Sequence, residues 1–178
     1  LNNFSFVEEI DSNNSLDYLQ CIVNSNLMNF YFKNVFIDYN IKPKYIEKLP
    51  IKNISQIEKL PFVEKSKLMV SLNINLQEVS NKFQRTLQRN FEGLEVLPKK
   101  IQEWYLLSFN EFLKELSKKK VKLSLEEEGK WEDFFISESK RTLEIKDLID
   151  KTDKEIDSMV YQLYNLTDEE IKIIESTT

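Results

Sequence analysis

Lysine and tyrosine side chains are interleaved over residues 39–52, and this stretch offers the clearest chemistry in the sequence. It holds Tyr39, Lys42, Lys44, Tyr45, Lys48 and Lys52 in a segment marked by Pro43 and Pro50. Recognition residues are commonly carried on irregular segments, and lysine ammonium groups neutralise phosphates. We therefore predict a DNA contact made by Lys42, Lys44, Tyr45, Lys48 and Lys52. The alternative is ordinary packing, with Tyr45, Ile46 and Leu49 packing a short turn and the lysines pointing to water.

Side chains for catalysis or metal binding are scarce. The chain has no His, one Cys and two Gly among 178 residues. A histidine-dependent hydrolase, an imidazole metal site and a thiolate zinc cluster are therefore excluded, as are glycine-rich phosphate loops. The carboxylate and lysine motif of a nuclease is also missing. We assign no catalytic residue and no metal ligand, and we expect the chain not to be an enzyme by itself.

Acidic residues gather at two places, 126–128 and 168–170. Both groups are expected in the first turn of a helix, where the helix dipole favours negative charge. We interpret them as helix-starting residues rather than as a pair of catalytic carboxylates.

The net charge of −5 hides a strong asymmetry along the chain. Residues 1–60 hold 6 basic and 7 acidic side chains, residues 61–123 hold 12 and 7, and residues 124–178 hold 7 and 16. A basic middle beside an acidic end is compatible with nucleic acid on one face, and equally with an ordinary solvated surface. No apolar run approaches the roughly 20 residues of a membrane span. We expect a cytoplasmic protein without a membrane contact.

Apolar residues recur at helical spacing from Ser15 to about Lys33 and predict a largely buried helix. Asn24 and Ser25 interrupt it and predict a break, because both side chains compete for backbone hydrogen bonds.

Two short strands are predicted near this helix. Alternating apolar and polar residues over 35–41 indicate one strand, and Phe4, Phe6 and Val7 indicate another at the start.

A long helix is predicted from Ser55 or Pro61 to about Asn90. Its apolar residues follow steps of three and four, the spacing of a coiled-coil seam, at Met69, Leu72, Leu76, Val79 and Phe83. An amphipathic helix is then predicted from the spacing of Phe109, Phe112, Leu113 and Leu116, ending in the lysine run at 118–120.

Three capping boxes divide the last third of the chain. Ser124 and Glu127 predict the start of a helical stretch over 125–164, and Thr152 and Glu155 predict a new start within it, at Asp153. Thr167 and Glu170 predict a last helix, from Asp168 to about Glu175.

Four segments resemble a known class of enzyme. Residues 19–34 (LQCIVNSNLMNFYFKN), 42–51 (KPKYIEKLPI) and 59–78 (KLPFVEKSKLMVSLNINLQE) resemble the end of the target-recognition domain in type IIG restriction-modification enzymes. The tail at 152–175, TDKEIDSMVYQLYNLTDEEIKIIE, is similar to the closing segment of the same methyltransferase-endonuclease chains.

The resemblance implies a carboxy-terminal piece of a longer chain. That parent would recognise a DNA sequence and methylate adenine with S-adenosylmethionine. It would either also cleave nearby with Mg²⁺ or only methylate, and the resemblance leaves both alternatives open. The methyltransferase motif N-P-P-Y is not present in this sequence, so no catalytic residue is carried over and no cofactor is expected here. The expected partners are double-stranded DNA and the catalytic domains of the parent.

The expected fold is mainly α, an antiparallel bundle of long helices with a small strand-containing (α+β) edge of a recognition domain. Residues 1–54 would be the remnant of that domain and residues 55–178 the helical spacer. The expected function is non-catalytic DNA recognition and spacing by a monomer. The alternative is a helical protein-interaction or dimerisation module without a role on nucleic acid.

Overall fold

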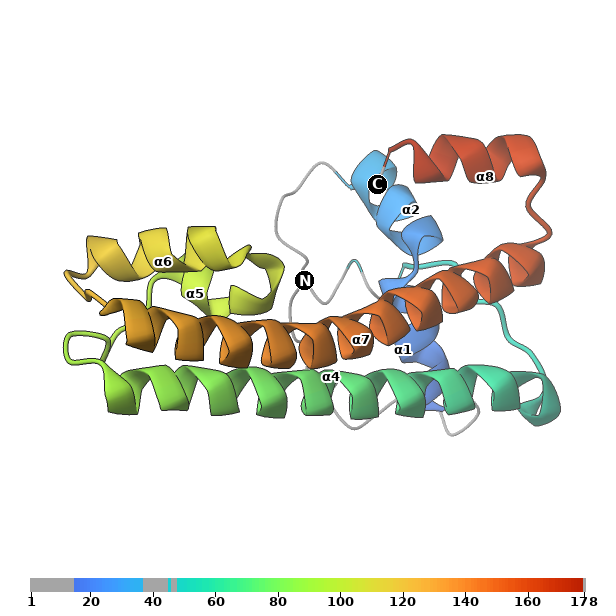
Figure 1. Cartoon of the computed structure of the whole chain (residues 1–178). Coiled ribbons are helices and arrows are strands. Elements are labelled where there is room, and N and C mark those ends of the chain that lie inside the picture. Colours follow the sequence, from blue (N-terminus) through green and yellow to red (C-terminus); the bar gives the residue numbers. More distant parts are fainter. Residues whose placement is uncertain (1–14, 37–44, 46–47, 178) are drawn as a thin grey trace. The chain divides into compact units, whose positions relative to one another are not determined.

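The structure is a computed structural model, and it describes residues 15–36, 45 and 48–177. The fold is mainly helical, as predicted, and no strand occurs among the described residues. The elements are α1 (Leu16–Asn24), α2 (Asn26–Val35), α4 (Gln56–Asn90), α5 (Lys99–Gln102), the 3₁₀ helix η1 (Trp104–Leu106), α6 (Phe109–Lys118), α7 (Leu125–Tyr164) and α8 (Asp168–Glu175) (Figure 1).

The predicted strand-containing edge is not seen in the described part of the chain. Val35, where the second strand was predicted to begin, is the last residue of α2, and Phe36 is its extended C-cap. Residues 37–41 and the predicted strand at Phe4, Phe6 and Val7 lie outside the described residues. The helical spacing of α2 therefore extends two residues beyond its predicted end at Lys33.

The break predicted at Asn24 and Ser25 is confirmed. Ser25 is both the C-cap of α1 and the N-cap of α2, and its hydroxyl accepts a hydrogen bond from the Met28 N–H. The same hydroxyl donates to the Ile22 carbonyl over 2.7 Å. One buried serine thus satisfies backbone groups from both helix ends.

Helix α4 begins at Gln56, and the Ser55 and Glu58 side chains cap it. The Ser55 N–H donates to the Glu58 carboxylate at 2.8 Å, and the Glu58 N–H donates to the Ser55 hydroxyl at 3.3 Å. The helix continues through Pro61. The earlier of the two predicted starts is therefore the observed one.

Helix α7 begins as predicted, with Ser124 and Glu127 forming reciprocal hydrogen bonds at its start. The second start predicted at Thr152 and Glu155 is wrong, because α7 is continuous to Tyr164. Thr152 is buried, one of several buried positions spaced by three and four residues on α7. Glu155 pairs with Lys65 at 2.5 Å instead of reaching back to Thr152.

The last predicted box is confirmed at Thr167 and Glu170, where both reciprocal hydrogen bonds are present at the start of α8. Asn165 has a φ of 54°, a left-handed conformation that asparagine tolerates and that turns the chain out of α7. Among the described helices, none has an apolar stretch that could cross a bilayer.

The chain forms two compact units. Unit 1 comprises 1–69 and 151–178, and unit 2 comprises 70–150, so α4 and α7 each contribute to both. This grouping by contacts differs from the predicted division at residue 54. The assignment of residues 1–54 to a recognition domain and of residues 55–178 to a helical spacer stays a prediction.

The core of unit 1 is formed by α1, α2, the first part of α4 and the last part of α7. Its buried residues are Tyr18, Cys21, Ile22, Met28, Leu49, Phe62, Ile156 and Val160.

The core of unit 2 is aromatic. The Phe83 ring lies flat on the Trp104 ring, with centroids 3.6 Å apart. Phe83 also meets Phe135 edge-on, and Phe91, the residue that follows α4, meets Trp131. The later end of α4 therefore lies against the earlier part of α7. Within unit 2 the two long helices are therefore antiparallel.

Candidate nucleic-acid interface

Two of the five predicted DNA-binding residues, Lys42 and Lys44, lie outside the described residues. Tyr45 is described and half-buried. Its ring lies 4.6 Å from the Phe36 ring and 6.1 Å from the Phe32 ring, measured between centroids. Tyr45 therefore packs against the end of α2.

Lys48 and Lys52 are both exposed. The Lys52 ammonium donates to the Leu163 carbonyl at 2.7 Å, in the last turn of α7. The Lys52 N–H also donates to the Tyr164 hydroxyl, and that hydroxyl donates to the Pro50 carbonyl. Lys52 thus supplies a cation where a helix leaves carbonyls unsatisfied. A DNA contact for these five residues stays a prediction.

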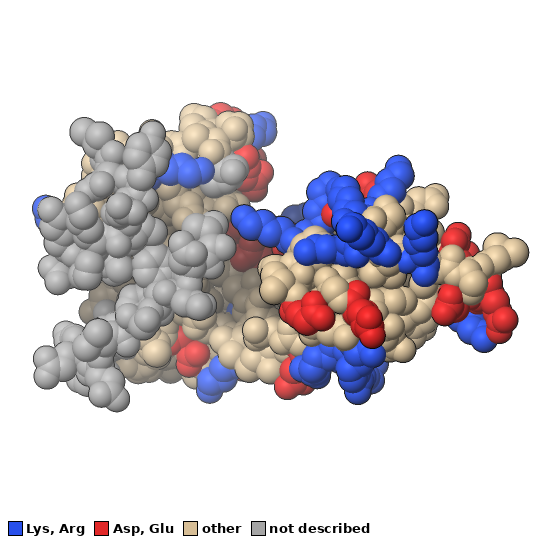
Figure 2. Space-filling view, turned by 90° about the vertical axis from the view of Figure 1, so that its left-hand side faces the viewer, with Lys and Arg blue, Asp and Glu red and all other residues tan. Residues whose placement is uncertain are grey.

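A second group of cations lies in unit 2 and was not nominated from the sequence. We call it the lysine face, and it consists of seven exposed lysines on α5, on α6 and in the following loop: Lys99, Lys100, Lys114, Lys118, Lys119, Lys120 and Lys122. Figure 2 shows a large group of Lys and Arg atoms in the upper part of the view and a second group below it, with Asp and Glu atoms between and beside them.

Helix α6 presents its lysines through its amphipathic pattern. Phe112 and Leu116 are buried, with 0% and 1% of their surface exposed. Lys114 and Lys118 each follow one of them by two residues, about 200° around the helix, and so point away from the core. The start of α6 is fixed by a capping box between Ser108 and Glu111. Hydrogen bonds from Ser108 hold the pKa of the Glu111 carboxyl below its usual value.

A buried carboxylate ties α5 to α6 beneath the lysine face. Glu115 is 7% exposed, and its Oε1 lies 2.7 Å from the Lys118 ammonium and 4.0 Å from the Lys100 ammonium. Glu115 thus holds two lysines from different helices near one another. Three carboxylates, Glu103, Glu111 and Glu115, stand against the seven lysines of residues 99–122, so this surface keeps an excess of positive charge.

The signal for the lysine face was present in the sequence but spread over two elements. The run at 118–122 reads as an ordinary lysine-rich loop, and nothing local links it to Lys99 and Lys100. The link depends on the turn of chain between α5 and α6. Ile101, Trp104 and Tyr105 are buried there at spacings of three and four, and this short helical pattern after Pro98 is the signal that could have indicated the turn.

No cluster of His, Cys, Asp or Glu that could hold a metal ion occurs among the described residues. The Cys21 thiol donates to the Phe62 carbonyl, and burial raises its pKa to about 12. The thiol therefore stays protonated near neutral pH.

Unit 1 contains one further buried acid. Asp157 on α7 accepts hydrogen bonds from the backbone N–H and the side-chain amide of Asn26, each at 2.8 Å, at the start of α2. Burial is the main cause that raises the pKa of Asp157 to about 6. The contact ties α2 to α7, and we interpret it as structural.

The comparisons with known proteins bear on the helical part of the chain. A family model described as a domain of unknown function (DUF8810) matches residues 55–160. No curated protein matches the chain, and no solved structure matches it. The matched range begins at the predicted boundary of the helical region and includes the whole lysine face.

Proposed function

We propose that this chain, which belongs to the family of the domain of unknown function DUF8810, is a non-catalytic region that binds double-stranded DNA and positions it. In this proposal the catalytic body lies elsewhere in a longer protein. The lysine face of unit 2 is the single observation that carries the proposal, because seven exposed cations on joined elements are suited to neutralising a row of phosphates.

Two further features support a positioning role. Helix α4 is unbroken over 35 residues and helix α7 over 40 residues, well beyond the usual length of a helix in a globular protein. The Glu115 carboxylate pairs with Lys118 at 2.7 Å and lies 4.0 Å from the Lys100 ammonium. Such pairing would lower the entropy that ordering these long side chains costs when phosphate binds.

The resemblance to type IIG restriction-modification enzymes supplies the kind of longer protein we have in mind. In that setting S-adenosylmethionine and Mg²⁺ belong to the parent's catalytic domains, and this chain contributes none of their ligands. The proposed partners are the DNA duplex and those catalytic domains.

The test of DNA binding is a salt titration with a fluorescent 25-base-pair duplex. The affinity of the wild-type chain should fall linearly with salt on logarithmic axes. Lys114→Ala with Lys122→Ala should reduce the magnitude of that slope by about 2, because each phosphate contact contributes about 1.

A matched control is Lys130→Ala with Lys140→Ala, which removes two exposed lysines of unit 2 that lie on α7 instead. This control should keep the wild-type slope. An absence of binding by the wild type at low salt, or equal slopes for both double variants, would contradict the proposal. Lys44→Ala with Lys48→Ala is tested in parallel. It measures how much the lysines predicted from the sequence contribute to the salt dependence of DNA binding.

A second experiment addresses the proposed lack of catalysis. The chain is incubated with DNA, S-adenosylmethionine and Mg²⁺, and methylated or cleaved product is assayed. No product is expected, and reproducible turnover that follows the chain through purification would overturn this part of the proposal.

The second candidate function is a helical protein-interaction module. Ile57 and Leu60 in the first turns of α4 are 79% and 57% exposed, which leaves aliphatic surface open on unit 1. Size-exclusion chromatography with light scattering separates the two candidates. A monomer at all concentrations favours the DNA role, and a concentration-dependent dimer favours the interaction module.

A further inference from the structure

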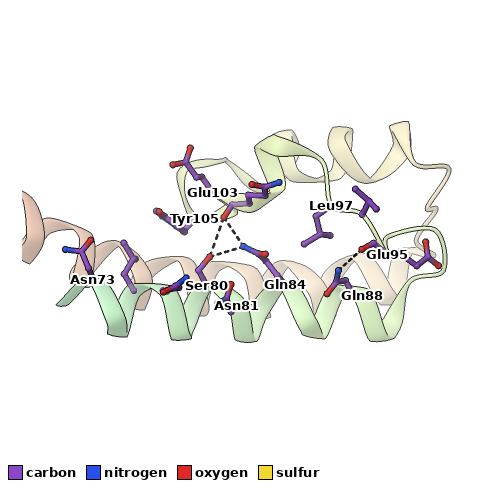
Figure 3. A pocket seen from close by; sticks show the side chains of 13 residues that line it. Asn73, Ser80, Asn81, Gln84, Gln88, Glu95, Leu97, Glu103 and Tyr105 are labelled. Atoms are coloured by element: carbon purple, nitrogen blue, oxygen red, sulfur yellow. Dashed lines mark hydrogen bonds between the residues drawn. The ribbon is translucent and has the colours of Figure 1, made fainter. Parts of the chain in front are cut away.

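Unit 2 contains an open groove of about 730 Å³ between α4 and the segment that runs from residue 95 to residue 105. Its lining is rich in carboxamides, which come mostly from one face of α4 (Figure 3). They are Asn73, Gln77, Asn81, Gln84, Gln88 and Gln102. The charged lining residues are Glu95 and Glu103, and no lining residue is basic.

Part of this carboxamide face already binds main-chain carbonyls. The Gln84 amide donates to the Gln102 carbonyl at 3.0 Å, and the Gln88 amide donates to the Glu95 carbonyl at 3.0 Å. These hydrogen bonds are drawn as dashed lines in Figure 3. Two side chains of this row thus donate hydrogen bonds to the main chain of the segment that lies across α4.

The row continues beyond the part that the chain itself occupies. Gln77 and Asn81 precede Gln84 and Gln88 on the same face, and neither side chain forms a hydrogen bond with any described residue. They are four residues apart, which separates them by about 6 Å along the helix. An extended chain repeats every two residues over roughly 6.6 Å, so the two spacings nearly match.

We propose that this groove binds an extended polypeptide segment that carries a basic side chain. Each free carboxamide offers N–H donors on its nitrogen and an acceptor oxygen, which complement the C=O and N–H of a peptide backbone. Glu95 and Glu103 would attract a Lys or Arg of the bound segment. A nucleic acid fits less well, because its phosphates would meet two carboxylates and no cation. Peptide binding in the groove does not depend on DNA binding by the lysine face.

The test uses a phage library of random octapeptides, selected on the immobilised full chain. Enriched peptides should carry Lys or Arg, and their affinity is then measured with synthetic copies. Gln77→Ala with Asn81→Ala should weaken binding by about tenfold or more, since each variant side chain removes a hydrogen-bonding pair. The matched control is Asn75→Ala, an exposed amide of α4 outside the groove, which should bind as the wild type does.

Two further arms distinguish binding in this groove from binding elsewhere on the chain. Glu103→Gln should weaken the binding of the basic peptides, because it removes a carboxylate while leaving the carboxamides intact. N-methylation of alternate backbone nitrogens in the peptide should abolish binding. Thermal unfolding of each variant confirms that it folds. No enrichment, equal binding by the Gln77/Asn81 and Asn75 variants, enrichment of acidic peptides, or displacement of the peptide by a twelve-nucleotide thymidine strand would overturn the proposal.

Discussion

Single lysines of this chain serve different purposes, and the surrounding structure decides which. The Lys52 ammonium binds the Leu163 carbonyl at the end of α7, whereas Lys114 is exposed on α6. Lys52 was nominated from the sequence because a basic residue beside tyrosines fits phosphate binding. Residue type alone could not separate the two roles, because the partner of Lys52 lies 111 positions away along the chain.

At the residue scale, Asp157 gives a prediction about pH. Burial raises its pKa from 3.8 to about 6, so the folded chain holds this proton more tightly than the unfolded chain does. The resulting stability is complete below the unfolded pKa and is lost as pH rises through about 6. The free energy of unfolding of the wild type, relative to Asp157→Asn, should therefore decrease between about pH 4 and pH 6.

Urea denaturation of both proteins at several pH values measures this difference. A difference that is constant, or that increases with pH, would show that Asp157 is not a buried acid with a raised pKa. Because the variant keeps the shape of the side chain, a loss of folding is not expected to obscure the comparison.

At the scale of elements, helix starts were predictable where a capping side chain faced no competing contact. Ser124 and Thr167 act as caps as the sequence indicated, and Ser25 lies at the predicted break, where it caps α2. Thr152 and Glu155 match the same pattern but lie inside α7, because Thr152 is buried and Glu155 contacts Lys65. Those long-range contacts are not encoded in the local motif.

The Ser124 cap gives a prediction about α7. Ser124→Ala should lower the free energy of unfolding by about 1 kcal/mol, since it leaves backbone N–H groups at the helix start without an acceptor. Chemical denaturation provides the measurement. The control is Ser137→Ala, at an exposed position within α7, which should be neutral or slightly stabilising. Equal effects of the two substitutions would mean that the cap contributes nothing.

The predicted seam of α4 gives a second element-scale prediction. Val79 is 7% exposed in unit 2, whereas Val70 on the same helix is 43% exposed. Val79→Asp should destabilise the chain by several kcal/mol because it buries a charge without a partner. Val70→Asp should have a much smaller effect. Thermal unfolding compares the two, and similar melting temperatures for wild type and Val79→Asp would contradict the burial of this side chain.

At the scale of the whole molecule, composition and periodicity were enough to predict a mainly helical chain. They could not predict the two compact units. Each unit combines one part of α4 with one part of α7, and these parts lie far apart in the sequence. The lysine face and the carboxamide groove were missed for the same reason. Both require the segment between α4 and α6 to pack around Trp104, which the spacing of single helices does not reveal.

The proposed function depends on contact between the lysine face and DNA, and hydrogen exchange can detect that contact at the residues concerned. Backbone amide exchange of the chain is measured by mass spectrometry with and without a 25-base-pair duplex at low salt. Slower exchange is expected over residues 99–122 when the duplex is present, with a weaker effect at high salt. Unchanged exchange over 99–122, under conditions in which the duplex is bound, would show that DNA binds elsewhere.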